Sequence, residues 1–229
     1  MNSAFLISLS EYARRLSPCD LLAHGLDVDD SFETAYKSWI VSFSDEELVT
    51  LMHVEARMMD VLERCKCRVM QAMPVEFLKL RPIRPANDLP HTLGGTIILG
   101  DAFFRAPPTH QTITLLHEQI HVFQRKHPGR AREIVQRHFG STVLKEGISP
   151  QTRARLRMRA NPDLDDAVYA DVANGTASYQ AYNSDTPHCL GDSSVQGPGP
   201  TEHPFETMAY QLSERMVRGD MDPRIAHLM

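Results

Sequence analysis

The chain lacks any long hydrophobic run. No stretch approaches the roughly 20 apolar residues that a membrane-spanning helix needs. Near the N-terminus, the apolar stretch Ala4–Leu9 is too short for the core of a signal peptide, and Arg14 and Arg15 follow it rather than precede it. We therefore expect a cytoplasmic protein without a membrane span.

The sequence also lacks a basic excess. Its 24 Lys and Arg residues are outnumbered by 29 Asp and Glu residues, which gives a net charge of −5. A nucleic-acid-binding domain normally has the opposite balance, so we expect no nucleic-acid partner. A local exception is a set of alternating arginines that would share one face of an extended segment. We interpret them as a solvated face, with a site for an acidic partner as the alternative: Arg153, Arg155, Arg157 and Arg159.

Cysteine is scarce as well. Four cysteines in 229 residues do not make a disulfide scaffold. Cys65 and Cys67 are separated by one residue, whereas the cysteine pairs of zinc ribbons are usually separated by two, and no second pair follows. We expect four plain reduced thiols.

What remains is the composition of an ordinary globular protein, with 42% hydrophobic and 23% charged residues. Residues 1–75 have helical periodicity throughout. Asp30 or Ser31 could cap a helix through Val41. Ser44, with Glu47 three residues later, forms a capping-box pattern ahead of a long apolar stripe. We expect this helical N-terminal segment to pack on a main domain formed by residues 76–229.

The main domain mixes both periodicities. Its expected elements, in chain order, are a short strand at Thr96–Leu99, a helix from Thr109 or Thr112 that Pro128 ends, a helix from Ala131 to Phe139, a hairpin of 167–172 and 176–182 around Asn174-Gly175, and a last helix from Pro204. The pattern predicts an α+β fold with a small, mostly antiparallel sheet.

Residues 117–121 read His-Glu-Gln-Ile-His, and they lie within the helix predicted to end before Pro128. Positions i and i+4 of a helix share one face, so both imidazoles can reach one zinc ion. The adjacent Glu118 then faces the open coordination position, where it can accept a proton from water. The alternative is a helix whose two histidines are ordinary surface or core residues.

The stretch Leu115–Gln124 resembles the active-site helix of zincin metallopeptidases. The later His-Pro-Phe-Glu-Thr-Met-Ala-Tyr, residues 203–210, resembles the Pro-x-Glu-x-x-Ala-Tyr helix of the gluzincin-like group, whose third ligand is glutamate. Leu89–Thr92 with Thr96–Leu99 resembles the substrate-side strand of such proteins, beside which an extended chain could pair. The resemblance covers roughly residues 85–215 and implies a zincin-like fold holding one Zn²⁺ per chain.

By that resemblance, His117, His121 and Glu206 are the metal ligands. Glu206 could instead satisfy backbone amides as a helix cap, and the substitute ligands are Glu202, His203, His188 and Cys189. The chain has neither an Asn-Glu-x-x-x-Asp pattern around Glu206 nor the His-x-x-Gly-x-x-His continuation of metzincins.

The implied activity is hydrolysis of peptide bonds in a peptide or protein substrate. Glu118 would act as general base, and a tyrosine would stabilise the oxyanion. We favour Tyr210 for that donor because it lies close to Glu206, with Tyr169, Tyr179 and Tyr182 as alternatives. Gln124 could orient a ligand or hold substrate, and the candidate partners for the ligand histidines are Asp101, Asp163, Asp165 and Asp166.

A second hypothesis comes from a different class of function. A zincin fold could keep its metal and act only by binding a partner. The arginine-rich segment and the N-terminal helices, which the resemblance leaves unexplained, motivate it.

Overall fold

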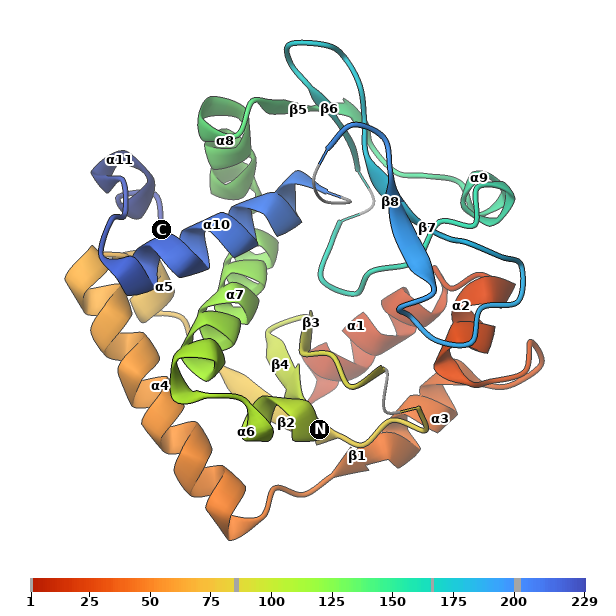
Figure 1. Ribbon diagram of the computed structural model, residues 1–229, viewed down its shortest axis with the longest axis horizontal. Helices are drawn as coiled ribbons and strands as arrows, with labels where there is room; N and C mark the ends of the chain where they lie inside the picture. The colour runs from red at the N-terminus through yellow and green to blue at the C-terminus, as the bar shows by residue number, and fades with distance from the viewer. Residues whose placement is uncertain (1, 85–86, 166, 200–202) are drawn as a thin grey trace.

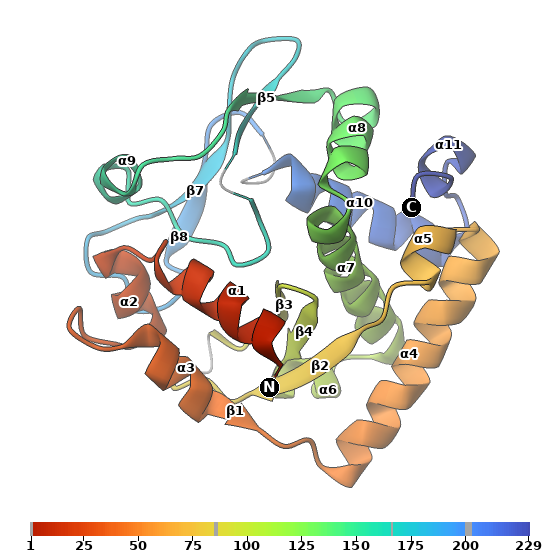
Figure 2. The same cartoon turned by 180° about the vertical axis from the view of Figure 1, so that it is seen from behind.

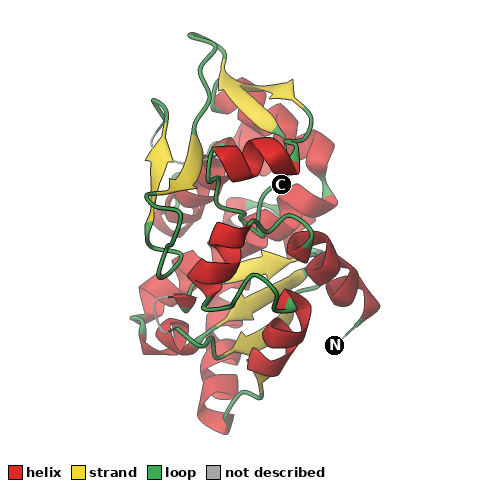
Figure 3. Cartoon of the chain, turned by 90° about the vertical axis from the view of Figure 1, so that its right-hand side faces the viewer, coloured by secondary structure: helices red, strands yellow, loops and turns green. Residues whose placement is uncertain are grey.

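The computed structural model describes residues 2–84, 87–165, 167–199 and 203–229 (Figure 1). Helices predominate, and the strands form one four-stranded sheet and two two-stranded sheets. Figure 3 shows the two small sheets at one end of the molecule, apart from the larger one. The α+β class predicted from the sequence is confirmed.

The larger sheet has the order β1-β2-β4-β3. Its strands are β1 (Ile40–Val41), β2 (Glu76–Leu80), β3 (His91–Leu93) and β4 (Thr96–Leu99). The β1/β2 and β3/β4 pairs are antiparallel, whereas β2 and β4 are parallel. The predicted strand at Thr96–Leu99 is confirmed, but it lies inside the sheet with both edges paired. The edge strand next to β4 is β3, and our expectation that an extended chain pairs beside Thr96–Leu99 is wrong.

This sheet separates two hydrophobic cores, because successive side chains of a strand point to opposite faces. The first core lies between the sheet and helices α1 (Ser3–Ala13), α2 (Pro18–His24) and α3 (Phe32–Trp39), which Figure 2 shows on this side of the sheet. Ile98 of β4 packs there with an aromatic cluster that includes Tyr36 and Trp39. Ile97 and Leu99 point into the second core.

The second core is built from helices on the other face of the sheet. They are α4 (Asp45–Cys65), α5 (Arg68–Gln71), α6 (Asp101–Arg105), α7 (Pro108–Lys126), α8 (Pro128–His138), α10 (Pro204–Arg218) and α11 (Pro223–Ala226). Helix α7 runs through the middle of this group, with α4 and α10 packed against it (Figure 1). Residues 1–75 thus contribute α1–α3 to one core and α4–α5 to the other.

Local signals placed several helix ends correctly. The capping box at Ser44 is confirmed: the backbone N–H of Ser44 donates to Glu47 Oε2 at 2.9 Å, and the backbone N–H of Glu47 donates to Ser44 Oγ at 3.2 Å. Ser31 caps α3, but that helix ends at Trp39, because Ile40–Val41 leave it to pair with β2. Helices α7 and α8 each begin at a proline, Pro108 and Pro128, a little before the predicted starts, because proline suits the first helical position.

The predicted hairpin around Asn174-Gly175 is wrong as a strand pair. The turn forms, with the backbone N–H of Asp171 donating to Thr176 O at 2.8 Å, but the chain then diverges. Strand β6 (Val168–Asp171) pairs with β5 (Ser141–Lys145), whereas β7 (Tyr179–Tyr182) pairs with β8 (Ser193–Gln196). The sequence therefore predicts the turn but not the strand pairing, because each of these strands pairs with a strand on the far side from the turn.

The arginine-rich segment does not form the extended, solvated face that we expected. Arg153 and Arg155 lie in helix α9 (Pro150–Arg155), and the Arg153 side chain is buried. Arg157 adopts a left-handed backbone conformation, with φ of 49°. The four guanidinium groups therefore do not form one surface stripe.

Two expectations from composition concern membrane spans and disulfide bonds. Among the described residues, no helix is both long and apolar enough to cross a membrane. The four cysteines are free thiols.

His24 should make the fold sensitive to acid. Its ring lies against Phe32 and Trp39 in the first core, at centroid distances of 5.0 and 6.2 Å. Burial, with smaller effects of His91 and Arg159, lowers the pKa of His24 to about 3. The unfolded chain takes up a proton near pH 6.5, so the stabilisation by neutral His24 is present above that pH and is lost as pH falls toward 3.

We expect the His24→Phe variant to show a shallower loss of unfolding free energy on acidification, by up to about 1.4 kcal/mol per pH unit between pH 6 and 4. Urea unfolding at several pH values measures this. His53→Gln, at an exposed position of α4, should retain the wild-type slope. Equal slopes in wild type and His24→Phe would contradict the account.

Candidate metal centre

Helix α7 presents His117 and His121 on one face, one turn apart. The opposite side of the helix is anchored by apolar side chains that are fully buried in the second core, namely Leu115, Leu116, Ile120 and Phe123. The two imidazole centroids are 4.7 Å apart, and the Nε2 atoms are 3.0 Å apart. Helical spacing has therefore brought two nitrogen donors to one point, as the sequence predicted.

Glu206 reaches the same point from α10. His203 caps this helix by accepting the backbone N–H of Phe205 on Nδ1 at 3.1 Å, which places Glu206 in the first turn. Ala209, one turn further along, is fully buried where α10 packs on α7. Glu206 Oε2 lies 3.4 Å from His117 Nε2 and 3.6 Å from His121 Nε2.

The three donors fit a zinc ion in chemistry and in spacing. Ligand atoms about 2.0–2.1 Å from a tetrahedral zinc lie about 3.3 Å from one another. The three separations here, 3.0, 3.4 and 3.6 Å, bracket that value. Two imidazoles and one carboxylate also match the donor set of catalytic zinc sites, which leave a position open.

Two amide side chains hold the donors in place. Gln124 Oε1 lies 2.8 Å from His121 Nδ1, and Gln124 Nε2 donates to the backbone carbonyl of Phe205 at 2.9 Å. Because Oε1 can only accept, His121 carries its proton on Nδ1, which leaves Nε2 free to bind a metal. Asn161 Nδ2 donates to Glu206 Oε1 at 3.0 Å and so turns Oε2 toward the histidines.

A buried ion pair is the alternative interpretation of this cluster. Burial lowers the pKa of His121, but the Glu206 carboxylate outweighs it and raises that pKa to about 10. Burial raises the pKa of Glu206, yet His121 and His117 hold it well below its usual range. The electrostatics therefore favour a positive charge beside Glu206, which either a proton or a metal ion can supply.

Glu118 distinguishes the two interpretations. Its side chain is 3% exposed, and Oε2 has no hydrogen-bond partner among the described residues. Burial and the nearby Asp163 carboxylate raise the pKa of Glu118 well above its usual range. An ion pair between His121 and Glu206 gives no reason to bury a second carboxyl group there, whereas a general base beside a metal-activated water needs one.

The substitute ligands lie elsewhere. His203 caps α10, and its Nε2 is 3.3 Å from Asp165. His188 and Cys189 bond to Asp192 through their backbone N–H groups. Glu202 lies outside the described residues. Glu206 faces the histidines and Asn161, and the cap is His203 instead.

The three donor residues His117, His121 and Glu206 are called the triad below. Among the described residues, Tyr210 is the only one of the four candidate tyrosines that lines the pocket beside this triad. Its ring centroid lies 4.5 Å from that of His117, and the side chain is 56% exposed. The hydroxyl groups of Tyr182 and Tyr169 donate to Asp20 and Asp165 respectively, and Tyr179 lines a separate pocket.

The candidate aspartates are also separated. Asp101 pairs with Lys79, and Asp165 with His203, while Asp166 lies outside the described residues. Asp163 lines the pocket and accepts hydrogen bonds from Thr92. The partner of the ligand histidine His121 is therefore Gln124 rather than one of these aspartates.

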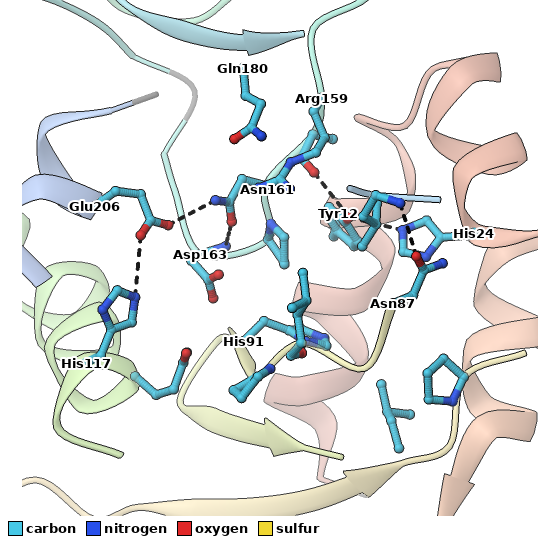
Figure 4. A pocket seen from close by; sticks show the side chains of 18 of the residues that line it. Tyr12, His24, Asn87, His91, His117, Arg159, Asn161, Asp163, Gln180 and Glu206 are labelled. Carbon is cyan, nitrogen blue, oxygen red and sulfur yellow. Dashed lines mark hydrogen bonds and ion pairs between the residues drawn. The ribbon is translucent and has the colours of Figure 1, made fainter. Parts of the chain in front are cut away.

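His117 and Glu206 face a pocket of about 520 Å³, and Figure 4 shows both side chains in it. One wall carries His117, Glu118 and Glu206, and a second carries the loop Asn161–Asp163. The far end is lined by side chains of the N-terminal helices, namely Tyr12, His24, Tyr36 and Trp39. The sequence did not place this far end at the site, because Tyr12 lies on an apolar stripe that indicates only a buried helix face.

Comparison of the chain with protein-family models, with curated proteins and with solved structures gives no match. The function is therefore argued from the geometry of the site.

We expect the Gln124→Leu variant to bind zinc about 10- to 100-fold more weakly, because it loses the acceptor that fixes the His121 tautomer. Competition with a chromophoric chelator measures the affinity. Gln111→Leu is the matched control: Gln111 is equally buried on α7 and donates to the backbone carbonyl of Phe103 at 3.1 Å, away from the triad. If both variants bind zinc equally well, Gln124 does not position the ligand.

Proposed function

We propose that this protein is a zinc-dependent hydrolase, namely a metallopeptidase, with His117, His121 and Glu206 holding one Zn²⁺. The observation that supports it is the combination of three converging donor atoms with a buried carboxyl group that has no hydrogen-bond partner among the described residues, beside a pocket that His117, Glu118 and Glu206 line. Zinc held there would act as a Lewis acid and lower the pKa of a water toward neutrality.

The chain's own residues would then carry the proton. Glu118 accepts a proton from water as it attacks the peptide carbonyl, and later donates that proton to the leaving amine. Its burial suits both steps, because a raised pKa brings the carboxyl group closer to the working pH. Tyr210, whose ring lies against that of His117 at the exposed side of the pocket, is the proposed donor to the oxyanion.

The second hypothesis, a zinc-containing interaction module without proteolytic activity, loses the features that motivated it. The arginines do not form a common face, and side chains of the N-terminal helices line the pocket. A buried carboxyl group without a hydrogen bond is also unfavourable for stability, and a module that only binds has no use for it.

The Glu118→Gln variant tests the proposal. It should retain zinc near one ion per chain and lose peptide hydrolysis by at least about 100-fold, because the amide cannot accept the proton. Removing a buried carboxyl group should leave thermal stability equal or higher. Elemental analysis, a peptide-cleavage assay and thermal unfolding measure the three quantities.

Glu214→Gln, on the surface of α10, is the control and should behave as the wild type. Full hydrolytic activity in Glu118→Gln would exclude Glu118 as the general base. A zinc-loaded wild type that cleaves no peptide would favour the interaction module.

A further inference from the structure

Resting on the proposed function, we propose that the pocket binds the free N-terminus of a peptide, with Asp163 holding the α-ammonium group and the aromatic end holding an apolar or aromatic first side chain. The protein would then act as an aminopeptidase rather than as an endopeptidase. Three features of the pocket carry this inference.

The first feature is the outer edge of β3, which is closed. Thr92 lies opposite Ile97 of β4, and its backbone N–H points away from β4 to donate to Asp163 Oδ1. Its hydroxyl group donates to the same oxygen at 2.9 Å. A long extended substrate therefore cannot pair at Thr92 as it would at an open sheet edge.

The chain just before β3 offers little more to an extended substrate. Pro90 has no N–H to donate. The carbonyl oxygen of Leu89 already lies 2.8 Å from His91 Nδ1, and His91 Nε2 lies 2.6 Å from the Tyr36 hydroxyl group. Recognition in this pocket must therefore depend on side chains more than on main-chain pairing.

The second feature is the position of Asp163. Figure 4 shows it between the Glu206 and His117 pair on one side and His91 on the other. Asp163 Oδ1 accepts two hydrogen bonds from Thr92, and Oδ2 accepts none from the described residues. The charge of Asp163 acts on Glu118, which lines the same pocket. Glu118 is more than nine-tenths buried, and its Oε2 has no hydrogen-bond partner in the described chain.

The Asp163 carboxylate lines this pocket and favours a cation beside it. The α-ammonium nitrogen of a peptide is about 2.5 Å from the carbonyl carbon that follows it. A substrate whose first carbonyl lies beside Glu118 therefore brings its ammonium group near Glu118, on which the charge of Asp163 acts from the facing wall. A blocked or internal peptide has no positive charge at that point to pair with the Asp163 carboxylate.

The third feature is the aromatic end. Tyr12, Tyr36 and Trp39 line it together with Leu80, Leu89 and Leu190. His24 adds no charge there at neutral pH, because burial lowers its pKa to about 3. The surface of this end suits an apolar or aromatic side chain, and it belongs to the same pocket as His117 and Glu206.

The first test is binding, with 2-phenylethylamine as a probe that has an aromatic ring and an ammonium group but no scissile bond. Calorimetry on the zinc-loaded protein should show at least ten-fold tighter binding of this amine than of 2-phenylethanol. Asp163→Asn should abolish the difference, since the amide keeps an acceptor for Thr92 but loses the charge. Thr92→Val is the control: it weakens the contact to Asp163, keeps the charge and should retain the preference.

The second test compares cleavage of Phe-Ala-Ala with that of N-acetyl-Phe-Ala-Ala. The wild type should favour the free peptide at least ten-fold in kcat/KM, and Asp163→Asn should lose that preference. If the acetylated peptide is cleaved as fast and Glu118→Gln abolishes both activities, the metallopeptidase proposal stands and this inference is overturned. If neither peptide is cleaved, the proposed function fails. Equal binding of the amine and the alcohol by the wild type would remove the ammonium site.

Discussion

The close packing of α10 on α7 is the constraint on which the metal centre depends. His117 and His121 are brought together by local helical geometry, but Glu206 reaches them only because α10 crosses α7 at short range. Ala209 of α10 is fully buried in the core that both helices share, and Gln124 of α7 donates a hydrogen bond to the carbonyl of Phe205 at their junction. A shift of one helix by a fraction of an ångström would change the ligand separations as well as the core.

The same junction links stability to the proposed chemistry. Gln124 bonds both to a ligand histidine and to the helix that carries the glutamate, and Asn161 holds the other oxygen of that glutamate. Neither amide would touch substrate in the proposed mechanism, yet each fixes the orientation of a donor atom. Such outer contacts decide whether ligands are preorganised or must be ordered when the metal binds.

The four-stranded sheet explains why the pocket has an aromatic end. Its strands bury both faces, so the N-terminal helices pack on the side that α7 leaves free. Their aromatic side chains meet the pocket at the edge strand β3, where Tyr36 contacts His91. The segment whose role the sequence left open thus shapes the site while also completing a core.

The sequence predicted the elements whose signals are local. The α+β class, the capping box at Ser44, the strand Thr96–Leu99 and the helix from Pro204 could all be predicted from short patterns. The one-turn spacing of His117 and His121 could also be predicted from a short pattern, because it depends only on helix geometry.

What could not be predicted depends on long-range packing. The strands around Asn174-Gly175 pair with partners beyond the turn, and Thr96–Leu99 lies inside the sheet because β2 and β3 cover both of its edges. Glu206 was proposed from a resemblance, and the structure brings it to the histidines. The zincin-like fold itself stays a prediction. Asn161 and the aromatic end had no local pattern that pointed to a site.

The central claim is that these three side chains bind zinc, and anomalous diffraction at the zinc absorption edge tests it most directly. In crystals of protein purified without added metal and then soaked in zinc, the account predicts one strong anomalous peak within about 2.0–2.2 Å of His117 Nε2, His121 Nε2 and Glu206 Oε2. The absence of a peak there, with the three side chains retaining their mutual contacts, would contradict it. The cluster would then be a buried ion pair, and the case for a hydrolase would fall with it.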